Sequence, residues 1–225
     1  MLEAGKVFTS FVSVAQTLQF RAELLIILDR LDEAAACASR CQSLAEKFSL
    51  GNYLDYANLM QGWIKLLRGD VDNGLREAES ALLVMRSIAS RRFHYPIRIA
   101  TVGRARAIAG DIAGALALFD DALHEVSVNG ERWYEAELLR LKAEMLMAQT
   151  PPHPADAEHC LQSAIALARK QEAKFWELRA ATALAEQWVD HGRRSEARDL
   201  IAPIYQSFTQ GLDRPDLKRA AALLA

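Results

Sequence analysis

The chain has 225 residues, of which 51% are hydrophobic, and its formal net charge is −2 at pH 7. So small a net charge argues against bulk electrostatic attraction to nucleic acid or anionic lipid, and the longest apolar runs, such as residues 24–28, are far too short to span a bilayer. The three cysteines are odd in number and lack the spacing of a disulfide framework, which is typical of a reducing compartment. We therefore expect a cytoplasmic protein.

A short phrase of small, charged and apolar residues recurs along the chain and precedes an alanine-rich amphipathic run each time. It reads Asp29-Arg30-Leu31, then Gly69-Asp70-Val71 and Gly110-Asp111-Ile112, and more loosely Gly192-Arg193-Arg194; the phrases at 69 and 110 lie 41 residues apart. Where a further phrase should fall, the proline-rich segment 151–154 interrupts the helical pattern. A fixed period of this length is the signature of stacked structural repeats.

In chain order, the pattern predicts five antiparallel helical hairpins and one terminal helix. The hairpins cover approximately residues 8–49, 52–90, 93–128, 132–171 and 174–210, and the capping helix covers 214–224. We expect an all-α solenoid, a right-handed superhelix that forms a single domain over residues 1–225. Nothing comparable to the capping helix precedes the first hairpin, so we expect exposed apolar surface at that end, which favours a homodimer or an upstream repeat.

Each hairpin has a small residue where its two helices should cross. Because the distance between packed helices follows the size of the contacting side chains, only glycine or alanine fits a close crossing. The residues on the first helices are Ala22, Gly62, Gly103, Ala143 and Ala185, and those on the second helices are Ala34, Gly74, Ala115, Ala157 and Ala197.

This pattern resembles the tetratricopeptide repeat, whose small residue, turn glycine and alanine–large–alanine stripe match Gly103, Gly110, Ala115, Phe119 and Ala122. The usual period is about 34 residues, so the helices here should be longer. Residues 130–141 (GERWYEAELLRL), 177–181 (ELRAA) and 208–217 (FTQGLDRPDL) resemble the C-terminal helical region of large bacterial signalling ATPases, some of which carry a cyclase or DNA-binding domain. The chain itself has no phosphate-binding loop. The resemblance implies a regulatory part of such a protein, with an attached or associated P-loop ATPase.

The resemblance further implies a concave groove that is lined by the first helix of each hairpin. Carrying the offsets from the small residues across the repeats places the candidate binding residues in rows: Tyr56, Trp63, Arg104, Glu137, Arg140, Glu144, Arg179 and Glu186. Two interpretations remain open. The charged residues could form an ion ladder that braces neighbouring helices, or Arg104 and Arg140 could hold an anionic group of a peptide or small ligand.

A second charged segment lies between Glu79 and Asp111, where arginines occur without acids. The arginines are Arg86, Arg91, Arg92, Arg98, Arg104 and Arg106, with Phe93, His94 and Tyr95 among them. Such a mixture can bind nucleic acid or an acidic partner. Because acids resume in the following elements, we expect internal pairing and no nucleic acid.

These features predict a protein-interaction scaffold or regulatory module that binds a peptide or protein partner in the groove. The alternative is a sensor for a small anionic effector. Cys37 and Cys41 supply too few ligands for a structural metal, and His153, His159 and Cys160 lack a carboxylate set. Without a placed nucleophile and base, we expect no catalysis, cofactor or metal.

Overall fold

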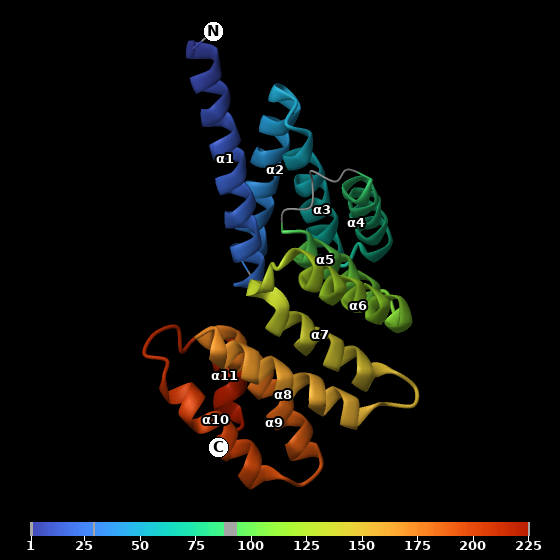
Figure 1. The fold of residues 1–225 in the computed structure, drawn as a ribbon, viewed down its shortest axis with the longest axis vertical. Coiled ribbons are helices and arrows are strands. Elements are labelled where there is room, and N and C mark those ends of the chain that lie inside the picture. Colours follow the sequence, from blue (N-terminus) through green and yellow to red (C-terminus); the bar gives the residue numbers. More distant parts are fainter. Residues whose placement is uncertain (1, 29, 88–93, 225) are drawn as a thin grey trace. The chain divides into compact units, whose positions relative to one another are not determined.

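The computed structural model describes residues 2–28, 30–87 and 94–224, and every regular element in these ranges is helical (Figure 1). Asp29 of the first recurring phrase lies outside the described residues, as do residues 88–93, where the second predicted hairpin ends and the third begins. The chain divides into two compact units, unit 1 (Met1–Asp111) and unit 2 (Ile112–Ala225), and each is described by itself. The all-α prediction is confirmed.

Unit 1 contains two complete hairpins and the first helix of a third. Its helices are α1 (Leu2–Ile27), α2 (Leu31–Phe48), α3 (Gly51–Leu67), α4 (Val71–Arg86) and α5 (Tyr95–Ile108). Each helix packs on its neighbours in sequence, and α3 also contacts α1 and α5. First helices of successive hairpins therefore lie beside one another, as the repeat pattern predicts.

Unit 2 continues the same alternation. It contains α6 (Ile112–Asn129), a 3₁₀ turn (Arg132–Tyr134), α7 (Glu135–Ala148), α8 (Pro154–Lys170), α9 (Lys174–Asp190), α10 (Arg194–Gln206) and α11 (Pro215–Ala222). Helix α9 contacts both α7 and α11 in addition to its sequence neighbours. Helix α11 thus takes the place that the first helix of a next hairpin would take.

The recurring phrase ends the first helix of a hairpin. Its glycines Gly69, Gly110 and Gly192 have φ of +96°, +90° and +79°, in the left-handed region that side chains disfavour. At the first of them, the glycine N–H donates to the carbonyl of Leu66 and the next N–H donates to that of Lys65, both at 3.0 Å. This pair of bonds is the Schellman ending, and the same pattern closes the helices before the other two glycines.

The predicted close crossing of α3 and α4 is present. A Cβ on Gly62 would lie 2.8 Å from the carbonyl oxygen of Gly74, and a Cβ on Gly74 would lie 2.6 Å from the carbonyl oxygen of Gly62 and from the amide nitrogen of Leu66. The alanines at the corresponding crossings are fully buried: Ala22, Ala34, Ala143, Ala157, Ala185 and Ala197. Between α3 and α4, the backbones approach so closely that no methyl group fits at either glycine.

This geometry makes Gly74 intolerant of even one methyl group. Alanine normally stabilises a helix interior by about 1 kcal/mol relative to glycine, but overpacking against backbone atoms costs about 1–3 kcal/mol. We expect Gly74→Ala to lower the free energy of unfolding, whereas Ser80→Ala on the exposed side of the same helix leaves it unchanged or slightly raised. Urea unfolding followed by circular dichroism checks both, and a stabilised Gly74→Ala variant would contradict the crossing.

Candidate functional site

The predicted binding residues of α7 form a buried ion pair and a partly exposed one. Both oxygens of Glu137 accept hydrogen bonds from Arg140, from Nε and from Nη2, each at 2.8 Å. Arg140 also pairs with Glu144 one turn further on. Glu137 is 1% exposed and Arg140 is 3% exposed, whereas the side chain of Glu144 is 39% exposed.

The same network continues across α9 and α11. Arg179 lies with Nη1 2.9 Å from Oε1 of Glu137 and with Nε 3.2 Å from Oδ1 of Asp216. Arg219 of α11 pairs with Glu186 of α9. The charges of Glu144 and Arg140 also act on Arg219, so we call these seven residues of α7, α9 and α11 the ion network; it contains five of the predicted residues.

The ion network contains four carboxylates and three guanidinium groups, so it carries one net negative charge. Burial alone would lower the pKa of Arg140, but the charges and hydrogen bonds of Glu137 and Glu144 outweigh it and raise the pKa above its ordinary value. The hydrogen bond with Glu186 likewise raises the pKa of Arg219. Arg140 and Arg219 therefore stay charged, and each of the three arginines has a carboxylate partner.

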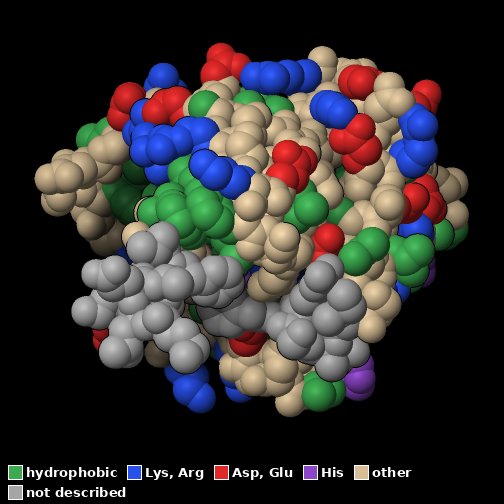
Figure 2. All heavy atoms as spheres, turned by 90° about the horizontal axis from the view of Figure 1, so that it is seen from above, with side chains coloured by type: hydrophobic (Ala, Val, Ile, Leu, Met, Phe, Trp, Pro, Cys, Tyr) green, Lys and Arg blue, Asp and Glu red, His purple; other side chains and the backbone are tan. Residues whose placement is uncertain are grey.

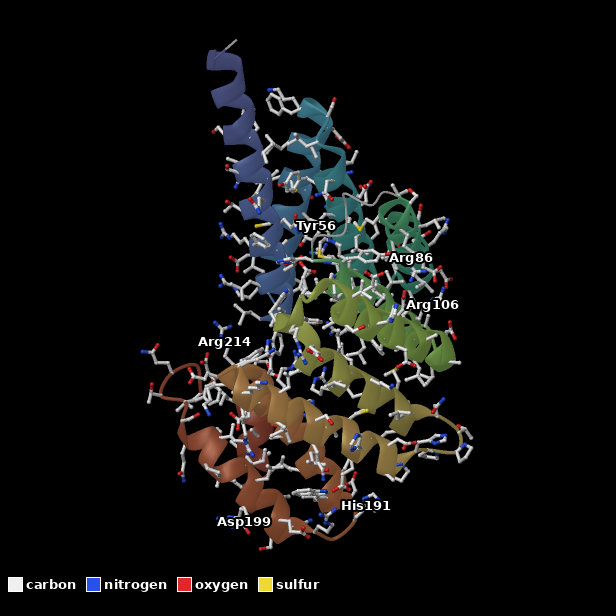
Figure 3. All side chains as sticks on the ribbon, in the orientation of Figure 1. Tyr56, Arg86, Arg106, His191, Asp199 and Arg214 are labelled. Atoms are coloured by element: carbon white, nitrogen blue, oxygen red, sulfur yellow. The ribbon has the colours of Figure 1, made fainter. Side chains whose placement is uncertain are left out.

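In unit 1, the corresponding aromatic residues lie in the interior. Tyr56 (labelled in Figure 3) is 0% exposed, and its hydroxyl donates to the carbonyl of Gln19 at 2.9 Å. Burial, reinforced by the charge of Glu23, raises the pKa of Tyr56 well above its ordinary value. Trp63 is also buried, and the guanidinium of Arg104 lies 4.7 Å from its ring centroid. Arg104 thus makes a cation–π contact with the buried Trp63.

The described arginines of the second charged segment contact other residues of unit 1. Arg86 donates to the hydroxyl of Tyr95 at 3.0 Å, and Arg106 pairs with Glu79 at 2.7 Å (both arginines are labelled in Figure 3). Arg98 is fully buried, 5.6 Å from the ring centroid of Tyr56. Arg91, Arg92 and Phe93 lie outside the described residues.

The helix α1 presents apolar side chains to solvent, as the sequence predicts for this end. Val14, Phe20 and Leu24 are exposed. In the view from above, hydrophobic side chains gather beside lysine and arginine side chains (Figure 2). Homodimer formation through this end stays a prediction.

A groove that was not predicted from the sequence lies on the other side of α3. The groove has a volume of about 480 Å³ and lies between α2, α3 and α4. Its floor is a polar stripe of α3, Asp55, Asn58, Gln61 and Lys65, whose spacing of three and four residues could have revealed it. The groove thus opens away from the row residues Tyr56 and Trp63.

The three cysteines are buried and unpaired with one another. Burial, followed by the neighbouring Cys37, raises the pKa of Cys41 to about 11, so its reactive thiolate is disfavoured. Among the described residues, no cluster of histidine, cysteine and carboxylate side chains is suited to a metal ion. Within the same ranges, no helix is long and apolar enough to cross a membrane.

The fold is similar to that of several solved structures. A signal-transduction ATPase with numerous domains and a tetratricopeptide repeat sensor, from Pyrococcus horikoshii, matches 93% of this chain with a TM-score of 0.64 and 13% identity. This chain spans 32% of that protein. A tetratricopeptide repeat protein of Thermus thermophilus matches with a TM-score of 0.61, 21% identity and coverage of 93% of this chain and 98% of its own.

A third match is the kinesin light chain-like repeat protein of Podospora anserina, with a TM-score of 0.60 and 15% identity over 84% of this chain and 92% of its own. The chain has a tetratricopeptide-like repeat fold. No family model and no curated protein matches it. The resemblance inferred from the small residues and turn glycines is confirmed at the level of the fold.

The burial of the ion network predicts how the free energy of unfolding changes when one charged partner is removed. Arg140→Met leaves the buried carboxylate of Glu137 with Arg179 alone, and removal of one partner from a buried pair costs about 3–5 kcal/mol. The matched change Glu144→Gln removes a partly exposed partner and should cost less than about 1 kcal/mol. Urea unfolding of both variants measures the difference; equal, small losses would contradict the dependence of the buried Glu137 on Arg140.

Proposed function

We propose that the chain is a protein-interaction scaffold with a regulatory role, and that it binds a partner segment across α7, α9 and α11. The observation that supports this most directly is the ion network. Its inner members Glu137 and Arg140 are buried and fixed by several bonds, while the side chains of Glu144 and Glu186 are 39% and 32% exposed. A rigid charged surface of this kind is preorganised, so little side-chain entropy is lost on binding.

The charge balance indicates the partner's chemistry. Carboxylates outnumber guanidinium groups in the ion network, and the outer carboxylates remain reachable from solvent. A lysine or arginine of a partner can pair with Glu144 or Glu186 without displacing any buried group. Charged pairs at the rim of an interface mainly set specificity and association rate. We therefore propose a partner segment with cationic side chains.

The alternative is an anionic effector held by Arg140 or Arg104. Arg140 already binds Glu137 through two hydrogen bonds and pairs with Glu144, so an anion would have to displace a carboxylate. Arg104 belongs to unit 1, where its guanidinium lies over Trp63. These contacts favour a protein partner over a small anion.

We further propose that the partner or the parent protein contains a P-loop ATPase. Support comes from the stretches 130–141, 177–181 and 208–217, and from the similarity in fold to the sensor-containing signal-transduction ATPase. Each repeat in such a fold contacts only its neighbours, so a bound partner can alter the packing of successive hairpins. That change is a physical route by which binding could reach an ATPase.

The test compares two double variants that remove equal charge. Glu144→Gln/Glu186→Gln alters the ion network, and Asp190→Asn/Asp199→Asn alters exposed acids of α9 and α10 (Asp199 is labelled in Figure 3). Partners are captured from an extract of the source cells with the unaltered chain, identified by mass spectrometry, purified and titrated against each form at low salt.

We expect the first double variant to weaken binding about tenfold and the second to leave it unchanged. Equal affinities, or no partner enriched over an unrelated helical protein, would contradict the scaffold proposal. A partner without a P-loop would contradict only its ATPase part. A melting temperature that rises with a small anion, and does so less in Arg104→Gln, would favour the effector alternative.

A further inference from the structure

We propose that the groove between α2, α3 and α4 is a second binding site, and that it holds a segment of polypeptide in extended conformation through its backbone. The groove lies on the side of α3 opposite to the buried Tyr56 and Trp63, and wholly within unit 1. It uses none of the residues of the ion network. The inference therefore goes beyond the proposed function and can fail or succeed independently of it.

The length of the polar stripe suits a short extended segment. Asp55, Asn58, Gln61 and Lys65 follow one another along the exposed side of α3. Ten residues of helix separate the first from the last, which corresponds to about 15 Å. An extended chain rises about 3.3 Å per residue, so the stripe matches about four to five residues of peptide.

The chemistry of the groove lining matches a peptide group. Gln42, Asn58 and Gln61 each carry a carboxamide, which offers donors and an acceptor together, as a backbone amide does. Their internal bonds use only part of this capacity: Nε2 of Gln42 donates to Oδ1 of Asn58 at 3.5 Å, and Nε2 of Gln61 donates to Oγ of Ser39 at 2.8 Å.

Among the described residues, Nδ2 of Asn58 and Oε1 of Gln61 make no hydrogen bond within the chain. One donor and one acceptor therefore remain on neighbouring turns of the helix. A peptide laid along the stripe can accept a bond from the first and donate a bond to the second.

The charge and polarity of the groove lining disfavour other classes of ligand. Nζ of Lys65 lies 2.5 Å from Oε1 of Glu77, so the charge of this lysine is already compensated, which disfavours phosphate groups as ligands. Most of the lining residues are polar or charged, which does not suit a purely apolar small molecule. On the α4 wall, Ala81 and the exposed Val84 offer a small apolar surface. Alternate side chains of an extended segment point to opposite sides, so every second one can rest there.

The probe is a linear peptide selected from a random displayed library on the immobilised full chain, then synthesised with a fluorophore. Its affinity is measured by fluorescence polarisation. The variant Asn58→Leu/Gln61→Leu removes both the available donor and the available acceptor, and the isosteric Asn58→Asp removes the donor alone. The matched control, Gln162→Leu/Gln206→Leu, changes two exposed carboxamides of α8 and α10.

We expect both groove variants to weaken binding about tenfold or more, and the control to leave it unchanged. N-methylation of the central amides of the peptide should weaken binding more than alanine substitution at the same positions, because the groove binds the peptide through hydrogen bonds to its backbone. The variant Glu144→Gln/Glu186→Gln should bind the peptide normally, which separates this site from the ion network.

Three results would overturn the proposal. The first is a library that yields no peptide above the background of an unrelated helical protein. The second is a selected peptide that binds the groove variants and the unaltered chain equally, with circular dichroism showing all of them folded. The third is tolerance of backbone N-methylation, which would assign binding to the peptide side chains.

Discussion

The close crossing of α3 and α4 at Gly62 and Gly74 sets the rotation of α3 about its own axis. Because backbone atoms of the two helices leave no room for a Cβ, α3 cannot turn without a clash. With this rotation, Tyr56 reaches the carbonyl of Gln19 on α1, and Trp63 lies under Arg104 of α5. The opposite side of α3 is left to the polar stripe, so one steric constraint determines both the interior and the groove of unit 1.

The two units fill equivalent positions of the repeat with different chemistry. In unit 1, Tyr56 and Trp63 bury aromatic surface, which is favourable in itself. In unit 2, the positions of Glu137 and Glu144 hold charges, whose desolvation is costly and must be offset by pairing. A buried pair adds little net stability but rejects arrangements that leave a charge unpaired. The ion network therefore specifies how α7, α9 and α11 pack more than how strongly they hold together.

Local features of the fold could be predicted from the sequence, because their causes are local. The type and spacing of residues predict where a helix ends at a left-handed glycine, as at Gly69, and where two helices cross closely, as at Gly62. The pairing of Glu137 with Arg140 follows from helical spacing alone. The link from Arg179 to Asp216 depends on how α9 and α11 pack, and the burial of Arg98 depends on its neighbours in space. The polar stripe of α3 could be predicted from its spacing in the sequence. The groove above it could not, because it depends on the separation of α2 and α4.

The most direct test is the relative accessibility of the two sides of α3. Single cysteines replace Asn58 on the groove side and Leu59 on the buried side, and the rate of alkylation by a thiol reagent is measured for each under native conditions. Because a buried thiol reacts only when the structure opens locally, we expect Asn58→Cys to react about 100-fold faster or more. Equal rates, or a faster reaction at Leu59→Cys, would contradict the orientation of α3 on which the interior and the groove depend.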